Sequence, residues 1–528
     1  MDSTTDIIRK QVETELHGSV TIVVLGASGD LAKKKTYPAL FGLFRQGFLP
    51  KKTHIIGYAR TKMTHEDYLD RITHSIKTTI HKDEDETNQL LDKFKSITSY
   101  QSGLYDQDDS WKALDKCISQ SEHQRQIDIG KKHRVFYMAL PPSVFVPVAK
   151  GLKKNVYSSE GMNRLVVEKP FGKDTQSSNE LGRELSGLFK ENEIYRIDHY
   201  LGKEMVKNVM MVRFANIFFN QIWDRKYIDN VQITFKETIG TEGRGGYFDQ
   251  FGVIRDVMQN HLLQVLSLIA MERPISTESE DIRNEKVKVL KCIPPIVLED
   301  ALLGQYIGAH GKPGYLEDDT LINKQSRTPT FAALTLWIQN ERWEGVPFIM
   351  KAGKALNDAK VEVRIQFRNV AGSLYKGSPR NELVLRVQPR EAVYVKFNNK
   401  QPGLSYQTIQ SDLDLTYDNR YTNLDIPDAY SSLLLDVLKG DHSNFVRNDE
   451  LEQAWKIFTP LLHTIDDPSI KVPITTYPYG SRGPTELDQF IKKYGYDRAN
   501  ENYVWPVQSL ASNTSSTSDS NDHSSPKL

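Results

Sequence analysis

Two kinds of apolar pattern alternate over the first 200 or so residues of the chain. Short apolar runs rich in β-branched residues predict strands, and they lie at 20–25, 54–58, 97–102, 134–140 and 164–168. Stretches with an apolar position every three to four residues predict helices, at about 32–46, 66–80, 84–94, 110–119 and 143–152. Strands that alternate with helices form a parallel sheet covered on both faces. The pattern therefore predicts an α/β domain with a Rossmann-like, doubly wound parallel sheet.

The pattern changes after about Leu201. Longer β-rich stretches at 230–237, 361–369 and 382–387 are mixed with helical patterns at 254–271 and 330–337. We therefore expect a second, larger α+β domain with a large, mostly antiparallel sheet. The expected division of the chain is an N-terminal extension over 1–18, a nucleotide-binding domain over 19–201, the α+β domain over 202–508 and a disordered, Ser-rich tail over 509–528.

The helix predicted at 254–271 combines an apolar surface in nearly every direction with a polar cluster. Protein should cover such a helix on all sides, so Gln259, Asn260 and His261 are expected to be buried. An unpaired buried polar group costs about 1–3 kcal/mol. These side chains therefore either satisfy one another or line a ligand cavity, and taken alone His261 fits a structural role best.

Composition narrows the partners and the compartment. The chain carries 68 basic and 68 acidic residues, which gives no general electrostatic reason to expect nucleic acid or a membrane surface. No apolar run is long enough for a membrane span, and residues 1–18 lack the apolar core of a signal peptide. The cysteines Cys117 and Cys292 are far apart in the sequence and have no metal-binding spacing, so we expect a reducing compartment, the cytosol.

A glycine turn follows the first predicted strand. Gly26 permits a sharp exit from the strand, Gly29 lets the backbone approach a pyrophosphate, and Ala32 packs the next helix on the sheet. The start of that helix offers free N–H groups to phosphates. Its spacing departs from the usual pattern, and an ordinary tight turn is the alternative. The candidate cofactor-binding residues of this turn are Gly26, Ala27, Ser28, Gly29, Asp30, Leu31, Ala32 and Lys33.

The end of the second predicted strand favours NADP over NAD. Arg60 stands where NAD-binding domains carry an acidic residue for the ribose 2′-hydroxyl, and a guanidinium suits a 2′-phosphate. A solvated charge at a strand end is the alternative for Arg60. After the fourth strand, the run 140–143 predicts either a bend near the nicotinamide half of the cofactor or a helix start capped by Ser143.

A third group of candidates follows the last two strands of the first domain. Lys169 should project from the carboxyl edge of the sheet, where ligands bind, and Pro170 allows a cis bond. Asp198 and His199 are adjacent, so their side chains should point apart and serve different atoms. If a helix begins here, His199 and Lys203 form an i, i+4 pair that can hold a phosphate. No second histidine stands at ligand spacing, so we expect no metal.

Four motifs, taken in order, resemble the eukaryotic type of the glucose-6-phosphate dehydrogenase family. They are 26–32 (GASGDLA), 168–172 (EKPFG), 196–204 (RIDHYLGKE) and 255–261 (RDVMQNH), with further matching stretches at 240–248 and 353–357. The nine-residue motif at 196–204 is the most specific of them. The likeness extends from about Thr21 to Trp505, which leaves the N-terminal segment and the Ser-rich tail outside it.

The resemblance implies a reaction and a role for individual residues. It implies NADP-dependent oxidation of glucose 6-phosphate at C1 to 6-phosphogluconolactone, the first oxidative step of the pentose phosphate pathway. His261 would be the general base, and Asp198 would fix its tautomer. His199, Tyr200 and Lys203 would face the 6-phosphate. The remaining substrate-binding residues would be Lys169, which also touches the cofactor, Glu237, Asp256 and Lys354.

The resemblance also implies an assembly and a possible second nucleotide site. The family suggests a homodimer or homotetramer formed through the large sheet. Some members bind a second, structural NADP in the larger domain, and one departure from their pattern is Lys351, where an arginine is typical. The positions that resemble this site are Lys351, Lys360, Arg364, Arg386, Tyr394, Lys396, Asp414, Arg482 and Trp505.

Two rival interpretations remain open at this point. A sugar dehydrogenase of the glucose–fructose oxidoreductase type shares the Glu-Lys-Pro motif but needs no phosphate pair such as His199 and Lys203. A catalytically inactive NADP-binding sensor could use the same fold, although the intact Asp198 and His261 argue against it. Turnover of glucose compared with glucose 6-phosphate would separate these possibilities.

Overall fold

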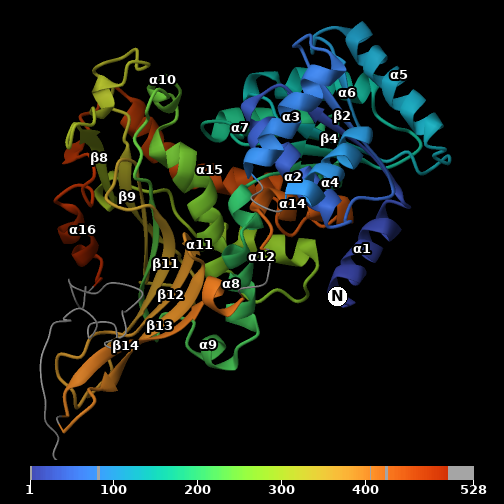
Figure 1. Ribbon diagram of the computed structural model, residues 1–528. Coiled ribbons are helices and arrows are strands. Elements are labelled where there is room, and N and C mark those ends of the chain that lie inside the picture. Colours follow the sequence, from blue (N-terminus) through green and yellow to red (C-terminus); the bar gives the residue numbers. More distant parts are fainter. Residues whose placement is uncertain (1–2, 80–83, 405, 422–425, 497–528) are drawn as a thin grey trace, which may run out of the picture.

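The computed structural model describes residues 3–79, 84–404, 406–421 and 426–496. The predicted tail at 509–528 and the candidate Trp505 lie outside these residues. The chain forms two bodies that share a junction (Figure 1): helices surround a parallel sheet in the first, and a broad, twisted sheet carries helices on one face in the second. No helix among the described residues is both long and apolar enough to pass through a bilayer.

The first sheet confirms the predicted Rossmann-like topology. Its six strands, counted over the described residues, are parallel and lie in the order β3-β2-β1-β4-β5-β6. They are β1 (Ser19–Leu25), β2 (Lys52–Ala59), β3 (Thr98–Ser102), β4 (Arg134–Met138), β5 (Asn163–Val167) and β6 (Ile194–Arg196). The helices that cover the sheet are α2 (Tyr37–Arg45), α3 (His65–Thr79), α4 (Glu84–Ser96), α5 (Asp108–Gln124), α6 (Phe145–Asn155) and α7 (Thr175–Ser186).

Burial on both faces explains why β1 is apolar without alternation. Ile22 and Val24 belong to the apolar cluster on one side of the sheet, and Val23 and Leu25 belong to the cluster on the other. Strands of parallel sheets are typically continuous apolar runs for this reason. The apolar pattern thus set both the strand and its central place in the sheet.

The second sheet is mostly antiparallel, as predicted. Its order is β14-β13-β12-β11-β7-β10-β9-β8-β15 over the described residues, and β7 with β10 and β8 with β15 are the parallel pairs. The strands are β7 (Ile228–Lys236), β8 (Ala301–Ile307), β9 (Phe331–Trp337), β10 (Pro347–Gly353), β11 (Lys360–Phe367), β12 (Glu382–Gln388), β13 (Ala392–Lys400), β14 (Thr408–Thr416) and β15 (Thr475–Pro478). Helices of the second body are α8 (Glu204–Phe214), η5 (Ile254–Leu262), α11 (Leu263–Ala270), α12 (Ser279–Lys291) and α15 (Asn448–Asp466). Helix α14 (Ala429–Lys439) packs on the first body.

The helix predicted at 330–337 was wrong, because this segment is strand β9. It pairs antiparallel with both β8 and β10, and residues 331–336 are buried. A short apolar run buried on both sides has no period that distinguishes a strand from a buried helix. The two alanines favoured a helix locally, and pairing between two neighbouring strands decided otherwise.

Several shorter elements lie within and between these bodies. They are η1 (Ala32–Thr36), η2 (Pro142–Val144), η3 (Glu191–Glu193), η4 (His199–Gly202), α9 (Ile217–Gln221), α10 (Gly245–Phe248), η6 (Leu298–Asp300), η7 (Tyr315–Glu317), α13 (Tyr417–Arg420) and α16 (Leu487–Lys493). The N-terminal extension also holds a helix that the sequence analysis did not predict, α1 (Ser3–Glu15). Its residue Val12 is buried, and α1 contacts α14, so this segment packs on the protein.

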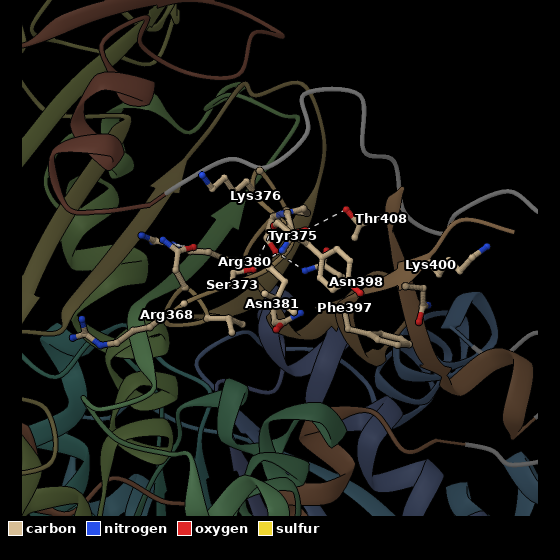
Figure 2. A pocket seen from close by; sticks show the side chains of 18 of the residues that line it. Arg368, Ser373, Tyr375, Lys376, Arg380, Asn381, Phe397, Asn398, Lys400 and Thr408 are labelled. Carbon is tan, nitrogen blue, oxygen red and sulfur yellow. Dashed lines mark hydrogen bonds between the residues drawn. The ribbon is translucent and has the colours of Figure 1, made fainter. Parts of the chain in front are cut away.

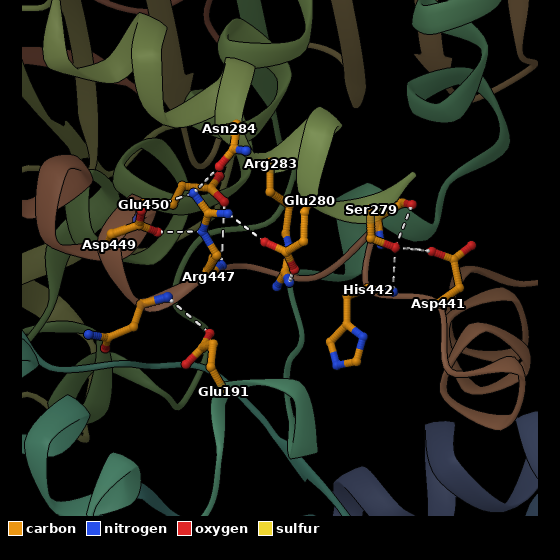
Figure 3. A network of polar contacts seen from close by, with 12 residues as sticks. Glu191, Ser279, Glu280, Arg283, Asn284, Asp441, His442, Arg447, Asp449 and Glu450 are labelled. Carbon is orange, nitrogen blue, oxygen red and sulfur yellow. Dashed lines mark hydrogen bonds and ion pairs between the residues drawn. The ribbon is translucent and has the colours of Figure 1, made fainter. Parts of the chain in front are cut away.

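Two late segments of the chain tie the bodies together. Helix α14 contacts α2 and η4, and Arg164 of β5 donates hydrogen bonds to the carbonyls of Val437 and Leu438 at 2.7 and 3.1 Å. A polar network (Figure 3) joins β6 to the starts of α12 and α15: Arg447 pairs with Glu280 at 2.6 Å, and the backbone N–H of residue 448 donates to Glu191. These contacts hold the start of β5 and the segment just before β6 against the late helices of the chain.

Candidate active site

The candidate residues of the first domain gather at one edge of the parallel sheet. The turn at Gly26 follows β1, Arg60 follows β2, Lys169 lies two residues beyond β5, and Asp198 lies two residues beyond β6. The carboxyl ends of parallel strands meet at the same edge, and ligands of open α/β folds bind there. The strand order reverses between β1 and β4, the position at which open α/β folds form their ligand crevice.

The geometry of the turn explains its glycines. Gly26 has φ +81°, and a Cβ there would lie 2.2 Å from the carbonyl oxygen of Ala139 in the loop after β4. The N–H of Gly29 donates to the carbonyl of Gly26 at 2.8 Å, which closes the turn. Ala32 is fully buried and packs the helix on the sheet, as predicted. The turn therefore brings backbone to the edge of the crevice, as a pyrophosphate requires.

Arg60 occupies the position expected of a 2′-phosphate ligand. It is exposed directly after β2, with its guanidinium carbon 5.9 Å from the ring centroid of Tyr105. The hydroxyls of Ser28 and Thr61 lie 3.0 Å apart and link this strand end to the glycine turn. After β4, residues 142–144 form a short 3₁₀ turn without a side-chain cap, so the alternative that Ser143 caps the following helix was wrong.

His261 and Asp198 form a buried pair across the junction of the two bodies. Nδ1 of His261 lies 2.5 Å from Oδ1 of Asp198, and both side chains are 3% exposed. The same carboxylate oxygen accepts the backbone N–H of Tyr200 at 3.0 Å, which fixes the Asp198 rotamer. The imidazole is thereby held in the tautomer whose Nε2 carries a free lone pair, the arrangement of a general base.

The helix that carries His261 is π-helical over Ile254–Leu262, whereas the apolar pattern predicts a period of 3.6 residues. In a π-helix, residues five apart face the same side, while in an α-helix they diverge by about 140°. Asp256 and His261 are five apart and therefore share the face that points at the crevice. Asn260 supports this segment by donating to the carbonyls of Arg255 and Asp256 at 3.1 Å.

The electrostatics of the pair suit a base that is neutral near pH 7. Burial lowers the pKa of His261, and the neighbouring Asp198 opposes but does not cancel that effect. Burial would raise the pKa of Asp198, but the charge and hydrogen bond of His261 outweigh it and bring that pKa to about 2. Asp198 is thus ionised and His261 is ready to accept a proton.

Aromatic rings surround the imidazole of His261. The ring of Tyr200 stacks on it with centroids 4.4 Å apart, and the ring of His199 meets it edge-on at 4.5 Å. The expectation that Asp198 and His199 point apart was wrong, because ligand atoms of Asp198, His199 and His261 all lie within 4.8 Å of one another. The turn of η4, together with His261 from a distant segment, brings them together. This trio is the one His/Asp cluster of metal-binding geometry within the described ranges.

His199 and Lys203 do not form the predicted i, i+4 pair. The helix η4 is 3₁₀ and ends at Gly202, and the backbone of Lys203 is extended, with φ −73° and ψ 137°. Nζ of Lys203 instead donates to Oε1 of Gln388, at the end of β12, at 2.7 Å. Burial, followed by the neighbouring His261, lowers the pKa of His199 well below its ordinary value, so His199 is neutral at pH 7 in the ligand-free protein.

The remaining substrate candidates form two cation–carboxylate pairs beside His261. Nζ of Lys169 lies 3.2 Å from Oδ1 of Asp256, and Nζ of Lys354 lies 2.5 Å from Oε2 of Glu237. Glu237 and Lys354 follow β7 and β10, whose parallel register ends them side by side. Because β7 and β10 run parallel, the carboxylate of Glu237 and the ammonium of Lys354 lie side by side at the carboxyl ends of these two strands.

A second group of candidates lies on the large sheet, along the strands β10 to β13. A cavity of about 180 Å³ is lined by Lys351, Lys360, Arg364, Lys396 and Arg482. Two buried carboxylates, Glu362 and Glu382, pair with several of these cations. Arg386 lies 3.8 Å from Glu362, and Tyr394 is opposite Asp414 in the β13–β14 register.

A cavity of about 1100 Å³ lies elsewhere (Figure 2). The loop 368–381 and the tip of the β13–β14 hairpin line it, and none of the predicted site residues does. Arg380 is held there by Asp229 at 2.7 Å. Size alone therefore does not mark the candidate active site. The chemistry gathers in the tighter crevice between the two bodies.

Two residues of the site, Gln388 and Tyr430, were not predicted from the sequence, and both are distant in the chain from the residues that they contact. Gln388 lies against Lys203, and the ring of Tyr430, from α14, stacks parallel to His199 at 5.8 Å. Neither residue belongs to a local motif with a chemical spacing. Tyr430 lies in an amphipathic helix pattern that reads as core, and the Pro after Gln388 marked only a strand end.

The fold and the site together define a two-domain oxidoreductase that uses a nicotinamide dinucleotide. The model of the glucose-6-phosphate dehydrogenase NAD-binding domain matches residues 23–208, and that of its C-terminal domain matches residues 210–504. The chain therefore belongs to the glucose-6-phosphate dehydrogenase family.

Individual relatives agree with this assignment. Glucose-6-phosphate 1-dehydrogenase of Emericella nidulans is 59% identical over 93% of this chain and 95% of its own length. That of Saccharomyces cerevisiae is 54% identical over 93% and 96%. A solved glucose-6-phosphate dehydrogenase in complex with its substrate glucose-6-phosphate is 52% identical, with a TM-score of 0.86 over 91% of this chain and 98% of that one.

Proposed function

We propose that this protein oxidises D-glucose 6-phosphate at C1 to 6-phospho-D-glucono-1,5-lactone and forms NADPH. The observation that carries the proposal is the buried Asp198–His261 pair at 2.5 Å, set at the edge of a dinucleotide-binding sheet. It agrees with the family of the chain and with relatives that are 50–59% identical and named glucose-6-phosphate 1-dehydrogenase. Neither the non-phosphorylated-sugar dehydrogenase nor the inactive sensor is favoured by these relatives.

In the proposed reaction His261 removes the proton of the C1 hydroxyl. Its Nε2 takes the proton, and Asp198 stabilises the imidazolium that forms. NADP, when bound, accepts the hydride from C1. The rings of Tyr200 and His199 keep water away from the imidazole, which strengthens its interaction with the carboxylate.

We assign the sugar and phosphate contacts to the groups around this base. Lys169, Asp256, Glu237 and Lys354 neutralise one another in pairs without ligand, so sugar hydroxyls can exchange into these hydrogen bonds at little electrostatic cost. His199, Tyr200 and Lys203 would hold the 6-phosphate. A bound phosphate dianion favours the charged imidazole, so its arrival would raise the pKa of His199.

The residues at the edge of the first sheet fit NADP. The φ of Gly26 and its closeness to Ala139 leave no room for a Cβ, so the turn presents backbone N–H groups. Arg60 would bind the 2′-phosphate, and Ala27, Ser28, Asp30, Leu31 and Lys33 complete the turn and the helix start. Lys169 lies between this edge and Asp256, where it can reach both ligands.

We assign a second, structural NADP to the cavity on the large sheet. Six cations and three carboxylates line it, so it carries an excess of positive charge suited to phosphates: Lys236, Lys351, Lys360, Arg364, Lys396 and Arg482, against Glu362, Glu382 and Asp488. Tyr394 and Asp414 lie on the neighbouring strands β13 and β14. Trp505 lies outside the described residues.

We infer a homodimer or homotetramer formed through the second sheet. The strand β14 is the edge of that sheet, and its Leu413 and Ile409 side chains are exposed. An exposed edge with apolar side chains is a typical surface for pairing. We also propose a cytosolic location, in line with two Arabidopsis thaliana relatives named as cytoplasmic, each 53% identical.

The proposed activity is tested by absorbance at 340 nm. Purified protein with NADP and glucose 6-phosphate should generate NADPH, and replacing the substrate by glucose should abolish most of the turnover, because the phosphate contacts are lost. Equal turnover of glucose would point to the non-phosphorylated-sugar dehydrogenase. Absence of turnover with both sugars, in protein that binds NADP, would support the inactive sensor.

A further inference from the structure

The second carboxylate oxygen of Asp198 has no hydrogen-bond partner among the described residues. Oδ1 of Asp198 contacts both His261 and the N–H of Tyr200, whereas Oδ2 is inaccessible and unpaired. A buried, unpaired oxygen of an ionised group carries a large desolvation cost. The proposed partner of the base therefore needs a further stabilising group.

Two buried glutamines near this oxygen are unpaired in the same way. Nε2 of Gln259 and Oε1 of Gln264 have no hydrogen-bond partner within the described ranges, and both side chains are buried. Gln259 belongs to the π-helix that carries His261, and Gln264 follows one turn later on α11. Unpaired donors and acceptors are uncommon in protein interiors, so three in one place call for a shared partner.

All three side chains line one small cavity behind the base. Its volume is about 20 Å³, and Phe171, Ile197 and Trp455 are among its apolar walls. A cavity must offer roughly 10–15 Å³ by this measure to hold one water. The sugar and the nicotinamide ring are far too large for it. The loop after β5, the π-helix and α15 contribute its lining residues.

We propose that Gln259 and Gln264 are positioning residues that hold one water molecule against Oδ2 of Asp198. The water donates to Asp198 and to Oε1 of Gln264, and it accepts from Nε2 of Gln259. This arrangement satisfies the three unpaired atoms with the two donors and one lone pair of a single water. The inference rests on the proposed function only where it concerns turnover.

The water restrains the orientation of the Asp198 carboxylate and reduces the extent to which that carboxylate raises the pKa of His261. A donor to Asp198 stabilises the anion most when His261 is neutral, because the imidazolium competes for the same charge. Removing the donor therefore favours the imidazolium and raises the pKa of His261. The base then loses its proton-accepting form at a higher pH, and its orientation is less restrained.

The test replaces Gln259 by Met, which keeps the length of the side chain and removes the amide. In Gln259→Met we expect kcat to fall about tenfold, because the base is less well oriented. The midpoint of the acid limb of the kcat–pH profile should move to a pH about half a unit higher. Both KM values should stay within about twofold of wild type, since Gln259 touches no proposed ligand.

Two controls separate positioning from a general loss of stability. Gln305→Met removes another buried glutamine, in β8, that donates to the carbonyls of Ser326 and Thr328, and it should lower the melting temperature without moving the acid limb. In an Asp198→Asn background, Gln259→Met should have little further effect on kcat, because Gln259 acts through the carboxylate that Asp198→Asn has removed. Equal losses in both backgrounds, or an unchanged acid limb in folded Gln259→Met, would overturn the proposal.

Diffraction decides the case independently of any variant. A high-resolution crystal structure of the wild-type protein should show one solvent molecule about 3 Å from both Asp198 Oδ2 and Gln259 Nε2. A cavity with no solvent peak, or a solvent that contacts neither atom, overturns the inference even if Gln259→Met does not fold. Wild-type turnover of glucose 6-phosphate is measured first, so failure of the proposed function is recognised separately.

Discussion

The crevice around His261 and the cavity on the large sheet both set lysines against carboxylates, but they do so differently. In the crevice each lysine has one carboxylate partner, as in Lys169–Asp256, and both members remain partly exposed. On the large sheet Glu362 is buried beneath several cations, and burial together with Arg364 lowers the pKa of Lys351 to about 7. The first site pairs its charges one to one, while the second collects an excess of positive charge.

Under the functions proposed above, this difference would separate a site for turnover from a site for static binding. In the crevice, a ligand can replace one member of a pair without leaving a buried charge unpaired. In the sheet cavity the carboxylates Glu362 and Glu382 are buried among several cations, so a bound anion would join this network and would not replace one of its members. The following variants and measurements test that contrast, beginning with the largest expected effect.

His261→Asn should lower kcat about 10³-fold, because the proton of the C1 hydroxyl loses its acceptor. Substrate and cofactor KM values should change little, since the imidazole bears on the transition state. Steady-state kinetics at 340 nm measures both quantities. The matched control is His123→Asn, at an exposed histidine of α5. Near-normal kcat in His261→Asn would show that His261 is not the base. The contrast between a site for turnover and a site for static binding would then lose its support.

Lys203→Ala should raise the KM for glucose 6-phosphate about 10- to 100-fold and leave the KM for NADP nearly unchanged. Loss of a charge-assisted hydrogen bond of about 2 kcal/mol accounts for this range. Lys112→Ala, at an exposed lysine of α5, serves as the control. Similar losses for substrate and cofactor would mean that Lys203 supports the crevice as a whole and does not bind the phosphate.

The acid limb of the wild-type kcat profile should lie below the ordinary pKa of histidine. Burial lowers the pKa of His261, and the reaction needs its neutral form, so activity persists to lower pH and then falls about tenfold per unit. The profile is measured on kcat, because kcat/KM also reports the free substrate phosphate, whose second pKa is about 6. An acid limb above pH 7 would contradict the dominance of burial over the Asp198 charge.

NADP should raise the melting temperature of the protein by a few degrees beyond the effect of catalytic-site binding. Arg482→Ala should lose that extra stabilisation and keep wild-type kcat, because Arg482 lines only the cavity on the large sheet. Thermal denaturation with increasing NADP, together with the binding stoichiometry, provides the measurement. If each chain binds a single NADP, and NADP stabilises the wild type and Arg482→Ala equally, the cavity on the large sheet does not bind a nucleotide.

The fold was predictable where burial alone determines the pattern. The strands of the parallel sheet are continuous apolar runs between helical periods, and their ends fell within a few residues of the prediction. The prediction of a helix at 330–337 was wrong because alanines and leucines fit a buried strand and a buried helix equally well. Helix α1 was missed since its few apolar residues pack on α14, more than 400 positions away in the chain.

The site was predictable residue by residue but not in its arrangement. The motif at 196–204 named Asp198, His199 and Lys203, yet the structure joins them through a 3₁₀ turn and contacts with His261 and Gln388. The pairing of Lys354 with Glu237 depends on two parallel strands about 110 residues apart in sequence. Such contacts leave no local period to detect.

The sequence by itself determined the layered nucleotide-binding domain and the glycine turn, because these follow from burial and local sterics, while the resemblance of its motifs to a known family named the residues beside the base. Only the tertiary structure decided that 254–262 winds as a π-helix, which turns Asp256 and His261 to one face. It alone also set the carboxylate of Asp198 against His261 and enclosed its other oxygen with Gln259 and Gln264. The physical reason is that these geometries arise from packing between segments distant in the chain, which no local pattern encodes.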